Sequence, residues 1–255
     1  MIEISSAQNT HFRRWQDLGS SRGIKKHQEF ILMGEKLIEE FLKNPHLKVK
    51  SEIICEGHSP LTSKLKLADK ITVFKLPKAL FNEIDVMGTH YNLLVLETPE
   101  LKLFEPTEVL PSQARQVITP LGDPSNLGAL ARSALAFGAH SLVLTQESAN
   151  PFHPKAIKAS AGALLRLTLL TSPLKLAELL EQNLNGTVAL DMNGIPLPEF
   201  KAQNALRIVI GEEGPGLPEK LKIQRVSIPT KGVESLNATV AASILLWHLS
   251  QNKVP

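Results

Sequence analysis

Three loops rich in glycine and polar residues contain most of the side chains that could do chemistry. They are LGDPSNLG (121–128), GEEGPGLP (211–218) and PTKGVESLN (229–237), and each follows a short apolar run. A glycine-rich turn that leads into a helix is typical of a phosphate-binding site. The spacing of the first loop matches none of the known phosphate loops, however, so the chemistry has to be read from all three loops together.

The residues after the first loop predict an amphipathic helix with a single charge, Arg132. Asn126 is expected to be the N-cap of this helix, accepting a hydrogen bond from a first-turn amide. The i, i+3, i+4 spacing of the core-facing side is given by Leu127, Leu130, Ala131, Ala134 and Leu135. The outer side has Ala129, Ser133 and Ala136 beside Arg132, which indicates that another element or a second subunit packs there. Taken alone, Arg132 would be interpreted as half of a surface or interface ion pair.

The second loop combines Gly211, Gly214 and Gly216 with two prolines. Glycines allow the backbone to approach a ligand closely, and prolines stiffen a loop. Backbone contact with a flat ligand is therefore favoured over a plain turn. Glu212 and Glu213 would repel a phosphate, so a neutral or cationic ligand fits better.

The third loop leads into an almost wholly apolar helix that is expected to start near Ser235. Asn237 would lie in its first turn, where it could bond to backbone or to a ligand. The uncharged run 238–247 predicts burial, either inside the domain or at a subunit interface. His248 is interpreted as a charge partner for the helix C-terminus.

Short apolar strands alternate with helices from residue 115 onward, which predicts an α/β fold with a mostly parallel sheet. In such sheets ligands bind beyond the carboxyl ends of the strands, where the three loops lie. The proline-rich stretch 97–113 is the best linker. The sequence therefore predicts a smaller N-terminal α/β domain over residues 1–110 and a second α/β domain over 111–255.

Composition narrows the class of protein. Of the 255 residues 43% are hydrophobic, and the formal charge of +3 is too small to establish a nucleic-acid partner. Residues 11–28 are locally basic, however, and could contact RNA phosphates or form a solvated helix end; their basic members are Arg13, Arg14, Arg22, Lys25 and Lys26. The single Cys55 excludes an intrachain disulfide and a multi-cysteine zinc site, and no metal is expected. Without a membrane span or signal-peptide core, a cytoplasmic protein is expected.

The three loops, read as NLGALAR (126–132), IGEEGPGL (210–217) and IPTKGVESLN (228–237), resemble the signature of the SpoU/TrmH family of the SPOUT superfamily. Members of that family are S-adenosylmethionine-dependent RNA ribose 2′-O-methyltransferases. The segment 153–167 also resembles the family's sequence between the first two motifs, so the likeness extends over about residues 115–250. Residues 9–40 resemble the L30e-like substrate-binding domain of many such enzymes, which favours ribosomal RNA of the 23S type as substrate.

The resemblance implies further properties. The C-terminal domain would be a deep trefoil knot, a topology that general folding rules disfavour, and the protein would be a homodimer. Arg132 would correspond to the family's catalytic arginine, acting as a base on the 2′-hydroxyl or as a phosphate clamp. The other active-site residues would be Asn126, Glu213, Ser235 and Asn237. Main-chain groups of Gly211, Ile228 and Leu236 would contact the cofactor. Glu212 departs from the asparagine that many relatives have in the second motif.

Three other interpretations remain open. The substrate could be tRNA, or the chain could be a noncatalytic RNA-binding or ribosome-assembly protein on the same fold. A Rossmann-type nucleotide-binding enzyme is disfavoured because no strand is followed by G-x-G-x-x-G.

Overall fold

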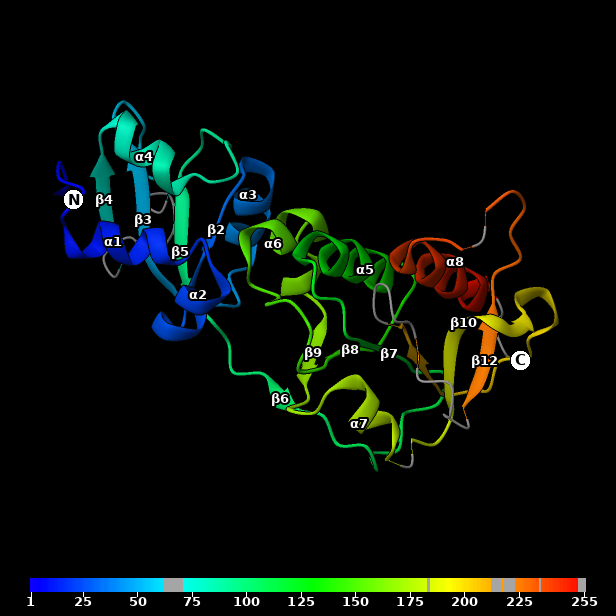
Figure 1. Ribbon diagram of the computed structural model, residues 1–255. Coiled ribbons are helices and arrows are strands. Elements are labelled where there is room, and N and C mark those ends of the chain that lie inside the picture. The colour runs from blue at the N-terminus through cyan, green and yellow to red at the C-terminus, as the bar shows by residue number, and fades with distance from the viewer. Residues whose placement is uncertain (62–70, 183, 212–216, 218–222, 234, 252–255) are drawn as a thin grey trace. The chain divides into compact units, whose positions relative to one another are not determined.

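The computed structural model describes the chain apart from residues 62–70, 183, 212–216, 218–222, 234 and 252–255. The chain divides into two compact units (Figure 1). The first unit contains Met1–Glu100 and Asn150–Gly162, and the second contains Leu101–Ala149 and Ala163–Pro255. The second unit therefore starts ten residues before the expected boundary, because β6 (Lys102–Leu103) pairs with β9 (Thr168–Thr171) in its sheet.

The first unit is a mixed sheet with helices packed against it. The strand order is β1-β4-β3-β5-β2, in which β5 runs antiparallel to both of its neighbours. The strands are β1 (Ile2–Glu3), β2 (Glu29–Leu32), β3 (Val49–Cys55), β4 (Thr72–Leu76) and β5 (Leu93–Glu97). The helices are α1 (Thr10–Asp17), α2 (Ser21–His27), α3 (Glu35–Lys43), α4 (Lys78–Ile84) and α6 (Pro154–Ser160). Aromatic residues of α1 and α4, among them Phe12, Trp15 and Phe81, fill the core beside Phe74 and Ile53 of the sheet.

The segment 150–162 belongs to the first unit although it lies among the motifs of the second. Its Phe152 ring is 5.1 Å from the Phe30 ring of β2, and Lys158 of α6 donates to the Met87 carbonyl. Burial of an aromatic pair of this kind contributes strongly to packing. The expectation that residues 111–255 form one continuous domain does not hold for this segment.

The second unit is a parallel sheet with the strand order β12-β10-β11-β7-β8-β9-β6. Its remaining strands are β7 (Arg115–Thr119), β8 (Ser141–Leu144), β10 (Thr187–Pro196), β11 (Leu206–Val209) and β12 (Gln224–Ser227). The α-helices are α5 (Pro124–Ala136), α7 (Leu176–Leu180) and α8 (Ala238–Gln251), and the short 3-10 helices are η3 (Ala163–Leu165) and η4 (Leu197–Glu199). The predicted α/β fold with a mostly parallel sheet is confirmed.

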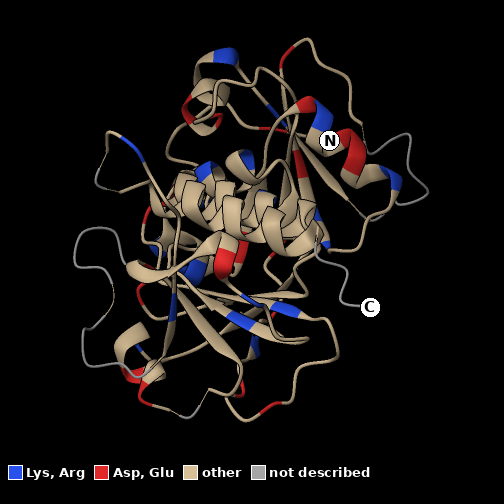
Figure 2. Cartoon of the chain, turned by 90° about the vertical axis from the view of Figure 1, so that its right-hand side faces the viewer, with Lys and Arg blue, Asp and Glu red and all other residues tan. Residues whose placement is uncertain are grey.

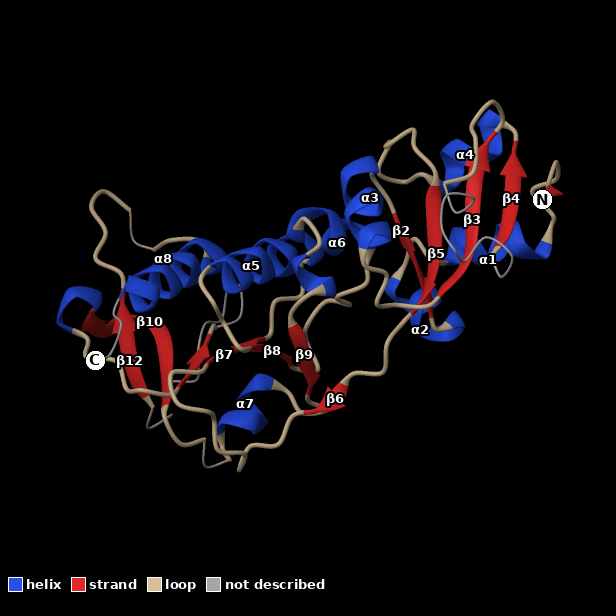
Figure 3. Ribbon diagram, turned by 180° about the vertical axis from the view of Figure 1, so that it is seen from behind, coloured by secondary structure: helices blue, strands red, loops and turns tan. Residues whose placement is uncertain are grey.

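Helices cover both faces of this sheet. Figures 1 and 3 show α5 and α8 along one face and α7 on the other. Leu176, Leu179 and Leu180 of α7 pack against Ile118 and Val209, which point to that face of the sheet. On the other side, Leu127, Leu130, Ala131 and Ala134 of α5 are fully buried, as predicted from their spacing. Leu135, which was expected on the same side, is only half-buried because it lies at the edge of this stripe. The N-terminal ends of α5 and α8 lie side by side, since the Thr239 hydroxyl is 3.3 Å from the Asn126 carbonyl.

Candidate active site

The first loop is held at the carboxyl end of β7 by the segment that follows β8. The carbonyl of Thr119 accepts hydrogen bonds from the Thr145 amide at 3.3 Å and from the Ser148 hydroxyl at 2.6 Å. The Ala149 amide donates to the Leu121 carbonyl at 2.9 Å. These bonds fix the loop through which β7 enters α5.

The N-cap of α5 is Asp123, which corrects the expectation that Asn126 would have this role. An Asp123 carboxylate oxygen accepts from the Asn126 amide at 2.8 Å, and Pro124 begins the helix. Proline is favoured at this first helical position because its missing N–H needs no partner there. Asn126 therefore lies in the first turn of α5, less than two helical turns before Arg132.

Arg132 lies on the exposed side of α5, away from the buried stripe. Among the described residues no carboxylate forms an ion pair with it, so the surface ion pair that its position suggests is not seen there. The small residues beside it range from half-buried Ala129 and Ser133 to exposed Ala136. An exposed guanidinium on a rigid helix can present its parallel N–H groups to a phosphate.

The third loop ends in a helix cap. α8 begins at Ala238 rather than near Ser235, and the Asn237 side-chain oxygen accepts from the amides of Thr239 at 2.9 Å and Val240 at 3.3 Å. Asn237 thus precedes the first turn in which it was expected. Ser235 is exposed beside it, while Leu236 is half-buried.

The structure brings the first and third loops together through their helices. The Thr239 hydroxyl lies 3.3 Å from the Asn126 carbonyl, and the Ser243 hydroxyl lies 2.7 Å from that of Ser133. Asn126, Arg132 and Asn237 are therefore carried by two helices in direct contact.

The second loop begins on the strand next to β7. The Ile210 amide donates to the Ile118 carbonyl at 3.0 Å, so half-buried Gly211 follows at the same edge of the sheet as Thr119. Ile228 directly follows β12, which is separated from β11 by β10, and its side chain is half-buried. Glu213, like Glu212, lies outside the described residues. The expected site roles of these residues, and those of Asn126, Arg132, Ser235, Leu236 and Asn237, stay predictions.

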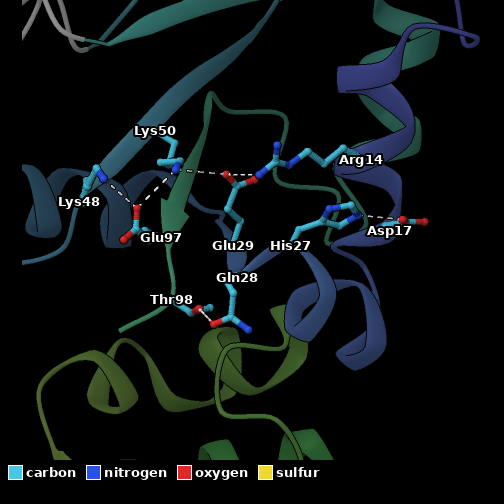
Figure 4. A network of polar contacts seen from close by, with 9 residues as sticks. All are labelled: Arg14, Asp17, His27, Gln28, Glu29, Lys48, Lys50, Glu97 and Thr98. Carbon is cyan, nitrogen blue, oxygen red and sulfur yellow. Dashed lines mark hydrogen bonds and ion pairs between the residues drawn. The ribbon is translucent and has the colours of Figure 1, made fainter. Parts of the chain in front are cut away.

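The basic residues expected to bind RNA differ in their surroundings, and Figure 4 shows one of them, Arg14, beside Glu29. Arg14 pairs at 2.5 Å with the buried carboxylate of Glu29, and Lys26 pairs at 3.1 Å with Asp17. Arg13, Arg22 and Lys25 are exposed, and none of them forms an ion pair within the described part of the chain. The three exposed side chains are therefore the better candidates for phosphate contacts.

Two further lysines, which sequence reasoning missed, form ion pairs in the same unit. They are Lys50 of β3 and Lys48, which lies just before that strand. Glu97 accepts from Lys48 at 2.9 Å and from Lys50 at 3.3 Å, as Figure 4 shows. These hydrogen bonds and the lysine charges hold the pKa of Glu97 below its usual value. Hydrogen bonds from His27 and Lys26 similarly lower the pKa of Asp17. The alternating K-V-K spacing at 48–50 was the available signal, because it places both lysines on one side of a strand.

The described residues offer neither a metal cluster nor a membrane-spanning helix. No cluster of three histidine, cysteine or acidic side chains that could hold a metal ion occurs among them. The helices in that part of the chain are also too short or too polar to cross a membrane.

Solved structures share the fold of this chain over nearly its whole length. An rRNA methyltransferase from Sinorhizobium meliloti, solved with AdoMet bound, superposes with a TM-score of 0.83 at 19% identity, covering 99% of this chain and 98% of that one. The SpoU methyltransferase AviRb from Streptomyces viridochromogenes gives 0.79 at 23% identity, covering 96% and 98%. The fold is therefore that of the SpoU class of methyltransferases.

Sequence relatives agree with the fold. The profile of the SpoU rRNA Methylase family matches residues 115–247. A protein of Syntrophobacter fumaroxidans named ribosomal RNA small subunit methyltransferase G 2 is 35% identical over 98% of this chain, which spans only 49% of that longer protein. The 23S rRNA (guanosine(2553)-2′-O)-methyltransferase RlmP of Bacillus subtilis is 29% identical over 98% of this chain and 99% of its own length. The chain belongs to the SpoU rRNA methylase family of RNA methyltransferases.

Proposed function

We propose that this protein transfers a methyl group from S-adenosylmethionine to a ribose 2′-hydroxyl of ribosomal RNA, most specifically of 23S type. The observation that carries the proposal is the contact between α5 and α8, which joins Asn126 and Arg132 of the first motif to Asn237 of the third. The full-length likeness to the 2′-O-methyltransferase RlmP supports the ribose as the target.

The residues at the strand ends suit a cationic sulfonium cofactor. Gly211, Ile228 and Leu236 have no charged side chain and are half-buried, so their main-chain groups would be the natural contacts. When bound, the cofactor supplies an activated methyl group. The new O2′–CH3 bond forms as the S–CH3 bond breaks, leaving S-adenosylhomocysteine, and the hydroxyl proton passes to a base or to water.

The chain's own contribution is alignment of the hydroxyl. Holding two reactants in line can lower a barrier by roughly 7 to 11 kcal/mol. Arg132 would grip an RNA phosphate with two N–H groups and so orient the adjoining ribose. A guanidinium stays protonated in ordinary surroundings, so the clamp needs fewer special conditions than a role as base. Asn126, Glu213, Ser235 and Asn237 would complete the site around the ribose.

The first unit would bind the RNA substrate in the manner of an L30e-like domain. Arg13, Arg22 and Lys25 are the proposed phosphate contacts, since Arg14 and Lys26 already pair with carboxylates. Lys48 and Lys50 already pair with Glu97 and are set aside on the same ground. An enzyme with such a substrate would work in the cytoplasm.

A homodimer, and the knot that the family resemblance implies, also belong to this proposal. Figure 2 shows the ribbon of α8 without the colours of Lys, Arg, Asp or Glu, in keeping with its sequence. Val240 and Trp247 are about half exposed and lie with Ile244 on the side opposite the buried residues Ala242 and Leu249. A second copy of the chain would cover this apolar stripe, as expected of an exposed hydrophobic patch.

The proposal is tested by methyl transfer from radiolabelled S-adenosylmethionine to rRNA and tRNA prepared from a deletion strain. Incorporation into rRNA, mapped to a single 2′-O-methyl position that the strain lacks, is the expected result. Incorporation into tRNA alone would favour the alternative substrate. Cofactor binding without transfer to either RNA would favour a noncatalytic RNA-binding protein.

A further inference from the structure

A polar seam joins α5 to α8, and Thr239 lies at the end of the seam nearest the motif loops. Its side chain is buried, with 6% of the residue exposed, and its hydroxyl lies 3.3 Å from the Asn126 carbonyl. One turn further along α8, the Ser243 hydroxyl meets that of Ser133 at 2.7 Å. Alanine and leucine side chains of the same two helices, such as Ala242 and Leu130, are fully buried.

The Thr239 hydroxyl is not required to satisfy the carbonyl that it meets. Asn126 lies inside α5, where a backbone carbonyl already accepts from the amide four residues later. A valine of the same shape would fill the same space without leaving that carbonyl unpaired. The added bond therefore does little for α5 itself and instead restricts how α8 can slide or turn against it.

The two ends that the bond joins carry different parts of the candidate site. Asn126 and Arg132 are on α5, on the proposed substrate side, whereas Leu236 and Asn237 immediately precede α8, on the proposed cofactor side. The amide of Thr239 is also one of the two that donate to the Asn237 side chain. One residue thus contacts the first motif with its hydroxyl and the third motif with its amide.

We propose that Thr239 is a positioning residue that sets the first and third motifs relative to each other for methyl transfer. This inference rests on the proposed function, since it concerns the alignment of the same two reactants. Thr239 itself does not touch the reacting atoms. Because small misplacements of reacting groups are costly, losing the hydroxyl should affect turnover more than binding.

The test compares Thr239→Val, which removes the hydroxyl and keeps the shape, with Thr239→Ser, which keeps the hydroxyl. Thr239→Val should lower kcat roughly fivefold to fiftyfold while the Kd for S-adenosylmethionine changes less than about twofold. Thr239→Ser should retain kcat within about threefold of wild type. Ser250→Ala, which removes a hydroxyl that bonds within its own helix, to the Trp247 carbonyl, is the matched control and should leave kcat nearly unchanged.

Amide hydrogen exchange gives a second readout that requires no activity. Thr239→Val should speed exchange in residues 124–130 and 238–242 together, and Thr239→Ser should not. Unchanged kcat and unchanged exchange in Thr239→Val would overturn the inference, as would an equal loss in Thr239→Ser. If the wild-type protein transfers no methyl group to any RNA, the proposed function fails, and the exchange data still decide whether Thr239 couples the two helices.

Discussion

The carboxylate of Asp123 accepts a hydrogen bond of 2.8 Å from the backbone amide of Asn126. This contact assigns the capping of α5 to Asp123 and leaves Asn126 inside the first turn. The two residues can therefore be separated by experiment, one through the stability of the helix and the other through the reaction.

Asp123→Ala should destabilise the protein, because an unsatisfied N-terminus typically costs about 1 kcal/mol. In a chain of this size that corresponds to a fall in Tm of roughly 2 to 4 °C. Asn126→Ala should change Tm less but reduce methyl transfer more. Thermal unfolding followed by circular dichroism, together with transfer assays, checks both. A larger Tm loss in Asn126→Ala would restore the capping role to Asn126.

Arg132→Lys should fail to replace arginine in the reaction. Lysine keeps the charge but cannot donate two parallel hydrogen bonds to a phosphate. Losing a hydrogen bond to a charged group costs about 1.5 to 3 kcal/mol, so kcat/KM should fall roughly tenfold to hundredfold. In Arg132→Ala, kcat/KM should fall by at least the same factor.

Arg166→Ala is the matched control for Arg132, because Arg166 is also exposed on the second unit and should leave transfer unchanged. Near-normal turnover by Arg132→Lys would contradict both the clamp and the base. A bell-shaped or shifted pH profile in that variant, with lower turnover, would favour the base.

The sequence predicted which segments are helical better than it predicted where the helices begin and what they pack against. The buried face of α5 followed from spacing alone, since Leu127, Leu130 and Ala134 had to face a core. The prediction of Asn126 as the cap was wrong, because aspartate and asparagine cap helices equally well and it is Asp123, followed by Pro124, that precedes the helix. The predicted start of α8, near Ser235, is three residues before the observed start at Ala238, an ordinary error at a helix end.

Contacts between distant segments could not be predicted in the same way. Nothing local to Arg14 indicates that Glu29 of another element will pair with it. Phe152 packs beside Phe30 of the first unit although the chain around it reads as part of the second. Strand order was equally hidden, since β10 lies between β11 and β12 and β12 does not pair with the strand that precedes it.

Arg14→Ala and Arg22→Ala should separate folding from RNA binding. Removing Arg14 leaves the buried Glu29 carboxylate with Lys50, 3.8 Å away, as its one ion-pair partner in the described part of the chain. An unpaired buried charge is costly, so the free energy of unfolding should drop by roughly 1 to 3 kcal/mol. Arg22 has no carboxylate partner among the described residues, so Arg22→Ala should keep its stability.

The effect on RNA binding should be the opposite, with Arg22→Ala the more affected of the two variants. Arg22→Ala should weaken binding and flatten the dependence of log K on log salt by about one phosphate contact. Urea unfolding and filter binding at several salt concentrations measure the two effects. Equal stability losses in both variants would show that the Arg14–Glu29 pair is not structural.

Glu97→Gln should change how stability depends on acid. Lys48 and Lys50 lower the pKa of Glu97 from an ordinary value of 4.5. A depressed carboxyl pKa stabilises the fold fully above the unfolded value and loses that contribution as pH falls through the folded value. Glu97→Gln should therefore be slightly less stable than wild type at pH 7, with the gap closing below pH 4.5.

Urea midpoints at pH 7 and pH 3 measure this difference, which should be small and shrink in high salt because the side chain is exposed. Glu100→Gln is the matched control, since Glu100 is exposed and forms no ion pair with a described residue. A gap that widens in acid would contradict the assigned direction.

Trp247→Lys should weaken the proposed dimer. Val240, Ile244 and Trp247 follow the i, i+4, i+7 spacing of one helical side, opposite the residues that α8 buries against its own unit. A charge in the centre of an apolar contact leaves an unpaired group, and large aromatic residues often dominate interface energy. The dimer Kd should rise roughly thirtyfold or more. Gln251→Lys, which adds the same charge at the exposed end of α8, should not change it. Light scattering across a concentration series reads the mass directly: if wild type and Trp247→Lys have the same mass throughout, the stripe on α8 is not the contact between copies.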